Sequence, residues 1–218
     1  AVLTGIQALV MGPPGQVRIG SWLVSGDLRV DIAFTLDALG LALLLLVAFV
    51  ALITLRFSVN YLHREAGFPR FFLLLSLFMG AMELIVMAGN AVLVFIGWEL
   101  AGVASYLLIA YNFERPVAVT NAQRAFIANR IGDAGFLLGI SFAYLWMGSS
   151  DWPLRPDQTL DPIKGDLIAL AFLLPALAKS AQLPFAPWVA RALEGPTPSS
   201  AIFYGALMVH AGVYLLIR

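Results

Sequence analysis

FLLPALAKSAQLPFAPWVARALEGPTP (Phe172–Pro198) decides how the rest of the chain is interpreted, because a lysine and several prolines interrupt an apolar segment. Lys179 is the only lysine within an apolar run, and Pro175 and Pro184 lie on either side of it. An ammonium group in hydrocarbon costs ~2.5–3.5 kcal/mol on insertion scales. Each proline removes a backbone donor, and broken membrane helices are tolerated where they face protein or water. We therefore predict that Lys179 lies on an ion pathway.

The composition is that of an integral membrane protein. Of the 218 residues, 61% are hydrophobic and 12% are charged, whereas about 25% are charged in globular proteins. The net charge is zero and gives no reason to expect nucleic-acid binding. The chain has no cysteine, two histidines, and no P-loop, dinucleotide-binding glycine motif or HExxH sequence. We therefore expect no metal site and no cofactor.

The sequence divides into an extramembrane segment, residues 1–34, and a transmembrane helical domain, residues 35–218. Glycine and proline interrupt the first segment, and the alternation in QVRIGSWLVSGDLRVDIAF predicts a short β-hairpin or an irregular segment. The start of the chain lacks the basic residues of a signal peptide. We expect the chain to start and end inside a longer protein.

The second domain has the length and apolar runs of about six membrane spans. A helix that crosses ~30 Å of hydrocarbon needs ~20 mostly apolar residues, which places spans at 36–56, 71–88, 91–111, 125–147, 166–188 and 199–217. The 43-residue run Phe71–Phe113 must turn once, and Gly89-Asn90 is the best breaker. Glycines in GWELAG and NRIGDAGFLLG indicate close helix packing. The predicted fold class is an all-α membrane protein with one discontinuous helix, the fifth span.

The loops between six spans alternate between the two sides of the membrane. One side collects arginines that flank the spans: Arg56, Arg64, Arg70, Arg115, Arg124 and Arg191. Basic residues in short loops near helix ends mark the cytoplasmic side. We therefore expect the N-terminus to lie outside.

Glu99 and Lys179 are the strongest candidates for chemistry within the membrane, because both lie well inside predicted spans. Burial favours the neutral form of each side chain, whereas mutual pairing favours the charged forms. A Glu–Lys pair whose separation changes would therefore act as a proton switch. The alternative is a static ion pair that fixes helix register. Intramembrane ionisable groups are functional by default, so we favour the switch.

Other candidates for the proton path have structural alternatives of similar weight. Glu83 could be a second proton station or could be solvated by lipid headgroups. Arg130 and Asp133, three residues apart on a helix, share a face and can pair, either as a relay or as a structural pair. His210 and Tyr204 on the sixth span could extend the path, or His210 could be a packed, hydrogen-bonded side chain.

Three stretches, GWELAGVASYLLIAY, NAQRAFIANRIGDAGFLLGI and AKSAQLPFAPWVARALEGPTPSSA, resemble the antiporter-like membrane subunits of respiratory complex I. The largest, distal subunit is the best match, and Mrp cation/proton antiporter subunits are related to it. The resemblance covers about residues 57–218. It implies paired five-helix repeats of inverted topology, of which this chain would hold the first. It also implies that Glu99 is the conserved channel glutamate and Lys179 its partner, with Arg130 and Asp133 in the NRxGDxGF motif.

Three positions differ from the pattern of this family. The family commonly has a histidine where this chain has Tyr204, an aspartate at the position of Gly89, and an apolar residue at the position of Glu83. His210 follows Tyr204 by six residues and lies elsewhere around the same helix. These differences indicate a divergent branch, and the sequence leaves the onward proton path from Lys179 open.

The resemblance implies a non-redox, proton-translocating subunit of an NADH:quinone oxidoreductase-like complex. Such a subunit would bind no NADH, quinone, flavin or iron–sulfur cluster. Its partners would be protons, the lipid bilayer and other membrane subunits of a respiratory or transporter complex, in a bacterial inner membrane. The alternatives are a cation/proton antiporter, which would carry Na⁺, or an inorganic-carbon uptake subunit on the same fold. A scaffold subunit that has lost pumping is the third possibility.

Overall fold

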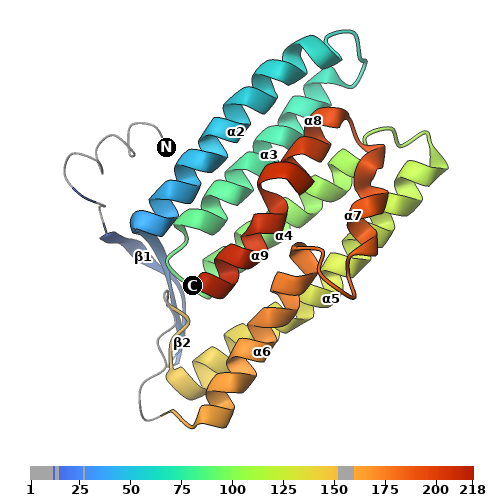
Figure 1. Cartoon of the computed structure of the whole chain (residues 1–218). Helices are drawn as coiled ribbons and strands as arrows, with labels where there is room; N and C mark the ends of the chain where they lie inside the picture. Colours follow the sequence, from blue (N-terminus) through green and yellow to red (C-terminus); the bar gives the residue numbers. More distant parts are fainter. Residues whose placement is uncertain (1–11, 13–14, 27, 152–159) are drawn as a thin grey trace.

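The computed structural model describes residues 12, 15–26, 28–151 and 160–218, without the side chains of residues 204–206. A two-stranded sheet lies at one end of a helical bundle, beside the start of α2 and the end of α9 (Figure 1). The elements in chain order are β1 (Gly15–Ser25), β2 (Leu28–Leu36), α2 (Ala38–Leu62), α3 (Phe68–Met87), α4 (Ala91–Ile109), α5 (Pro116–Met147), α6 (Pro162–Lys179), α7 (Pro187–Arg191), the 3₁₀-helix η1 (Ala192–Glu194), α8 (Thr197–Ser200), the π-helix η2 (Ala201–Ala206) and α9 (Met208–Ile217).

The hairpin of β1 and β2 covers the turn between α3 and α4. Its strands are antiparallel, and β2 is partly buried whereas β1 is exposed along its whole length. The backbone N–H of Gly89 donates to the carbonyl of Ala33 at 2.7 Å, and Asn90 Nδ2 donates to the carbonyl of Asp31 at 2.8 Å. The α3–α4 turn, which lies at the Gly89-Asn90 breaker, is therefore attached to β2.

The helix ends follow ordinary capping chemistry. Asp37 accepts a hydrogen bond from the N–H of Gly40 at 2.8 Å, and Asn90 accepts one from the N–H of Leu93 at 2.9 Å. Both are side chains that satisfy an otherwise unpaired donor in a first helical turn. Gly148 ends α5 with φ of +71°, a left-handed conformation that glycine adopts without strain.

Two pairs of helices pack so closely that glycine is required at the contact. A methyl group added at Gly97 of α4 would lie 2.9 Å from the carbonyl oxygen of Ala81 on α3. A methyl group added at Gly132 of α5 would lie 2.5 Å from the Cβ of Ala178 on α6. Small residues let membrane helices approach and gain dispersion contacts, as predicted for the glycines of these two segments.

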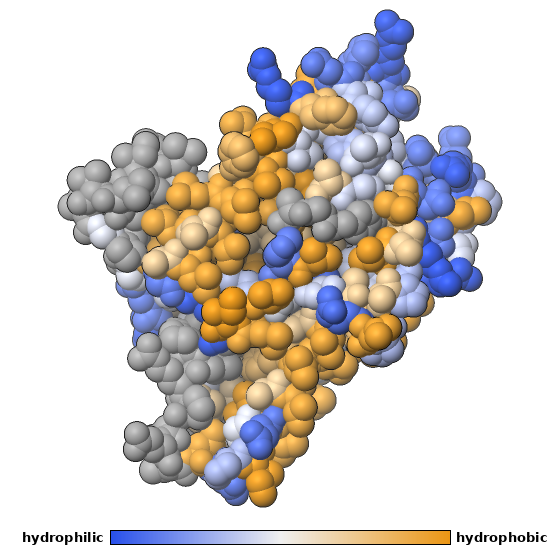
Figure 2. Space-filling view, viewed as in Figure 1, coloured by the Kyte–Doolittle hydropathy of each residue, from blue (hydrophilic) through white to orange (hydrophobic). Residues whose placement is uncertain are grey.

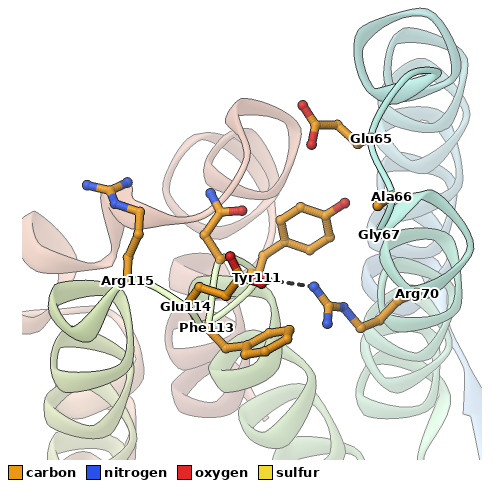
Figure 3. A pocket seen from close by; sticks show the side chains of 9 residues that line it. Glu65, Ala66, Gly67, Arg70, Tyr111, Phe113, Glu114 and Arg115 are labelled. Carbon is orange, nitrogen blue, oxygen red and sulfur yellow. Dashed lines mark hydrogen bonds between the residues drawn. The ribbon is translucent and has the colours of Figure 1, made fainter.

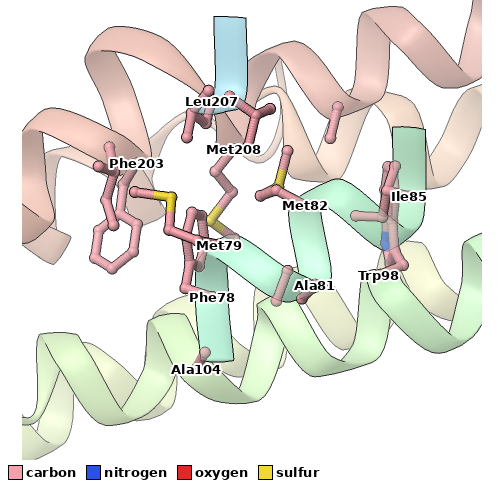
Figure 4. Packing of buried hydrophobic residues seen from close by; sticks show 14 of the residues in the cluster. Phe78, Met79, Ala81, Met82, Ile85, Trp98, Ala104, Phe203, Leu207 and Met208 are labelled. Atoms are coloured by element: carbon pink, nitrogen blue, oxygen red, sulfur yellow. The ribbon is translucent and has the colours of Figure 1, made fainter. Parts of the chain in front are cut away.

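The core lies between α3, α4 and the C-terminal helices. Phe78 and Met82 of α3 meet Phe203 and Met208 from η2 and α9, and Trp98 of α4 extends the same cluster (Figure 4). The rings of Phe78 and Phe203 are 5.4 Å apart in an edge-to-face arrangement, which is a favoured geometry for aromatic pairs. This core fixes α4, and therefore the backbone on either side of Trp98.

Four helical segments in the described part of the chain are long and apolar enough to cross a membrane: α2, α3, α4 and the run Thr197–Ile217. Apolar residues cover much of the surface along the helices, whereas hydrophilic residues gather where α2 meets α3 and near the start of α5 (Figure 2). The predicted fourth span lies in α5, and the predicted fifth span, 166–188, runs from α6 through the interruption after Lys179 to the start of α7. Helices α5 and α6 each carry three charged residues. The chain is thus a mostly helical membrane protein, and the number of six spans stays a prediction.

A hollow of about 430 Å³ lies between the start of α3 and the loop after α4 (Figure 3). Arg70 donates from Nη2 to the carbonyl of Tyr111 at 2.7 Å. Its guanidinium also lies 5.0 Å from the centre of the Tyr111 ring and 4.9 Å from that of Phe113. These cation–π contacts fix the loop between α4 and α5 against α3.

Candidate functional site

Lys179 is the last residue of α6 and is only 1% exposed. Its Nζ donates to the backbone carbonyl of Trp98 on α4 at 3.3 Å and lies 5.0 Å from the centre of the Trp98 ring. The C-terminal end of a helix carries partial negative charge, which favours a cation at this position. The ammonium group is therefore held by a helix end, a carbonyl and an aromatic face.

The helical interruption begins immediately after Lys179. Residues 180–186 form turns, with Ala181 at φ of +52°, before α7 begins at Pro187. Two side-chain hydrogen bonds hold this interrupted segment. Trp188 Nε1 donates to the carbonyl of Ala178 at 2.8 Å, and Ser180 Oγ donates to the carbonyl of Val209 at 2.6 Å. The carbonyl of Ala178 near the end of α6 thus has a donor on α7, as a buried helix end requires. The hydroxyl of Ser180 attaches the start of the interruption to α9.

Pro175 does not act as a helix breaker, contrary to the prediction that prolines interrupt the helix on both sides of Lys179. It lies inside α6, which continues to Lys179. The carbonyl that it leaves without an N–H donor belongs to Ala171 and faces Gly135 of α5, where an added methyl would come within 2.8 Å. A neighbouring helix packed this closely supports the irregular backbone.

Glu99, Arg130 and Asp133 form a charged cluster between α4 and α5. Arg130 Nη1 lies 2.5 Å from Glu99 Oε2 and 3.7 Å from Asp133 Oδ2. The predicted pairing of Arg130 with Asp133 is confirmed at this distance, although the shorter contact is to Glu99. The Arg130 side chain is 48% exposed, whereas those of Glu99 and Asp133 are 22% and 8% exposed. The arginine therefore closes the cluster on its outer side.

The structure does not show the predicted Glu99–Lys179 ion pair. Within the described residues, the ion-pair partner of Glu99 is Arg130, and Lys179 is bonded to the carbonyl of Trp98 instead. The physical reason is that Trp98 precedes Glu99 on α4 and occupies the space beneath the ammonium. The carboxylates of Asp133 and Glu99 still act on Lys179 electrostatically. A direct Glu99–Lys179 contact stays a prediction.

Sequence reasoning missed Trp98, although it stands directly before Glu99 in GWELAG. The side chain is 1% exposed, and its Nε1 donates to Asp133 Oδ1 at 3.0 Å. A buried indole N–H usually has a hydrogen-bond partner. A tryptophan next to a glutamate within an apolar helix could therefore have indicated that Trp98 belongs to the site. Trp98 contacts both Lys179 and Asp133.

The other predicted residues lie outside this set of contacts. Glu83 is half-buried on α3 and His210 is exposed on α9, beside Tyr214. Neither takes part in an ion pair within the described part of the chain. The side chain of Tyr204 lies outside the described residues, so its role stays a prediction. No group of three or more His, Cys, Asp or Glu residues that could hold a metal ion occurs among the residues the structure describes.

Two family models match this chain. Residues 88–218 match the transmembrane region of NADH:quinone oxidoreductase/Mrp antiporter proteins, and residues 22–72 match the N-terminus of chain 5 of NADH-ubiquinone oxidoreductase, complex I. The chain is 41% identical over 206 residues to a chloroplastic NAD(P)H-quinone oxidoreductase subunit 5 from Anthoceros angustus, covering 91% of this chain and 28% of the relative. It is 39% identical over 208 residues to NADH-quinone oxidoreductase subunit L of Mycobacterium tuberculosis, covering 92% and 32%.

Solved structures share the fold. A chain in the Mrp complex from Dietzia sp. DQ12-45-1b matches all of this chain with a TM-score of 0.86 and 28% identity, over 24% of its own length. A chain of an archaeal membrane-bound sulfane sulfur reductase matches 98% of this chain with a TM-score of 0.77 at 21% identity, which is a likeness of fold alone. This chain spans a third or less of the length of these relatives.

Proposed function

Because this chain belongs to the family of NADH:quinone oxidoreductase and Mrp antiporter membrane subunits, we propose that it acts in proton translocation in an NADH:quinone oxidoreductase-like complex. The observation that carries the proposal is the position of Lys179. A 1% exposed ammonium stands at the end of an interrupted helix, close to two carboxylates that share one arginine. A buried group of this kind can hold or release a proton when its neighbours move.

The proposed transfer step is electrostatic. While Lys179 is charged, it stabilises the ionised forms of Asp133 and Glu99. If the last turn of α6 moves away from α4, the carboxylates lose that stabilisation and take up a proton, and Lys179 gives up its own proton more readily. Return of the helix reverses both changes. The irregular segment 180–186, between α6 and α7, supplies a place where the backbone can bend in such a movement.

The redox-linked function is favoured over a sodium/proton antiporter by the sequence relatives. The curated relatives named above, at 41% and 39% identity, are quinone oxidoreductase subunits, whereas the Mrp structure is 28% identical. The proposal includes an N-terminus outside a bacterial inner membrane and the first five-helix repeat of the antiporter-like fold. It also includes other membrane subunits as partners.

The ion and its driving force can be tested together in the assembled complex, reconstituted in vesicles. We expect NADH oxidation by quinone to acidify the vesicle interior without sodium. Proton movement driven by a sodium gradient alone, with no NADH, would instead support the antiporter.

The residues can be ranked in the same vesicles. Glu99→Gln should abolish most proton transport, whereas Glu83→Gln should have a smaller effect because Glu83 makes no ion pair within the described residues. Native gel electrophoresis checks that each complex assembles. A larger loss in Glu83→Gln than in Glu99→Gln would contradict the proposed site.

A further inference from the structure

We propose that Trp98 is a positioning residue that connects Lys179 on α6 to Asp133 on α5. This inference rests on the proposed function, in which the charge of Lys179 controls the protonation of nearby carboxylates. It assigns to the indole a part in that control beyond packing. Trp98 would orient the Asp133 carboxylate and at the same time hold the Lys179 ammonium.

A single residue makes three polar contacts across the site. The indole Nε1 donates to Asp133 Oδ1 at 3.0 Å, the backbone carbonyl of Trp98 accepts from Lys179 Nζ at 3.3 Å, and the Trp98 ring lies 5.0 Å below the ammonium. The indole thus lies between α6, which carries the cation, and α5, which carries the carboxylate. No direct ion pair joins Lys179 to Asp133 in the described part of the chain.

The surroundings keep the indole in one orientation. The ring of Phe136 on α5 meets the Trp98 ring edge-on, with centres 5.3 Å apart. Phe136 is fully buried and packs in turn against Phe172 of α6 at 5.4 Å. A ring confined in this way cannot turn its N–H away from Asp133 without disturbing both helices. A displacement of α6 therefore reaches the indole as well as the ammonium.

The N–H and the ring face have separable effects. A hydrogen bond donated to a carboxylate favours its ionised form, so the indole N–H should help to keep Asp133 charged beside Arg130, Glu99 and Lys179. The ring face attracts the ammonium by a cation–π contact, which gains strength in a desolvated site. Trp98→Phe removes the N–H and keeps an aromatic face, whereas Trp98→Leu removes both.

The contact can be tested by following the protonation of Asp133 by infrared spectroscopy in the purified complex. The carboxyl band is assigned as the one that disappears in Asp133→Asn. We expect Trp98→Phe to raise the pH at which Asp133 is half protonated by about one to two units, the strength of a hydrogen bond to a charged group. Trp146→Phe is the matched control, because Trp146 stacks on Phe142 rather than on the site.

Proton transport is then measured on the same variants. We expect Trp98→Phe to slow transport about tenfold and Trp98→Leu to slow it further, while Trp146→Phe stays at the rate of the unchanged protein. An unshifted Asp133 band in an assembled Trp98→Phe complex would overturn the inference, even if transport fell. A shifted band in a complex that transports no protons would support the inference and refute the proposed function.

Discussion

Replacement of Gly132 by alanine should loosen the contact between α5 and α6 beside Lys179. The added methyl would lie 2.5 Å from the Cβ of Ala178 and 3.2 Å from the Cα of Pro175, whereas carbon atoms in contact prefer about 3.5–4.0 Å. Such overpacking costs about 1–3 kcal/mol. The gain from replacing a helical glycine offsets about 0.5–1 kcal/mol of it. We therefore expect a net loss of about 0–2.5 kcal/mol in the free energy of unfolding.

Gly80→Ala is the matched control, because nothing lies within 4 Å of a methyl group at this exposed position on α3. It should leave the free energy of unfolding unchanged or raise it by up to about 1 kcal/mol. Denaturant unfolding in mixed micelles measures both variants. The double variant Gly132→Ala/Ala178→Gly removes the clashing methyl and should recover part of the loss. Equal stability of Gly132→Ala and Gly80→Ala would refute the close contact.

Two further predictions concern the hairpin and the interruption in α6. The hydrogen bond from Arg29 holds the pKa of Asp31 below its ordinary value, so its stabilising effect is full above about pH 4 and is lost as the pH falls through the lowered pKa. The protection of β1 and β2 amides against hydrogen exchange, taken relative to the intrinsic exchange rate at each pH, should therefore fall in acid. Asp31→Asn should remove this acid step, and an identical step in the variant would contradict the prediction. Trp188→Phe leaves the carbonyl of Ala178 without its indole donor and should lower the free energy of unfolding by about 1–3 kcal/mol. Denaturant titration measures this loss against the control Trp146→Phe, and equal losses in the two variants would contradict the prediction.

The helices were predictable from the sequence because their signals are local. Apolar runs of membrane length, the Gly89-Asn90 breaker and the alternation before Asp37 all depend on neighbouring residues. The structure has helices at the apolar runs, a turn at Gly89-Asn90 and strands before Asp37. The interruption after Lys179 could be foreseen from its prolines, but its position could not. That position depends on Trp188 and Ser180, whose partners on α6 and α9 are contacts that a linear pattern does not contain.

The sequence predicted which charged residues form the candidate site, but it predicted only part of the ion pairing among them. Glu99, Lys179, Arg130 and Asp133 all stand out as charges within apolar helices, and the structure brings them into one region. Their partners depend on how α4 is rotated relative to α5 and α6, which no local sequence pattern determines. In the structure, the orientation of α4 places Trp98 beneath Lys179 and pairs Glu99 with Arg130.

The buried charge of Lys179 is proposed to take part in proton transport. Lys179→Ala should abolish most NADH-driven proton uptake by vesicles containing the assembled complex. Lys164→Ala removes the exposed lysine in the first turn of α6 and should leave uptake unchanged. Proton uptake is measured with a pH-sensitive dye, and native gel electrophoresis measures assembly. Full proton uptake by an assembled Lys179→Ala complex would contradict the account.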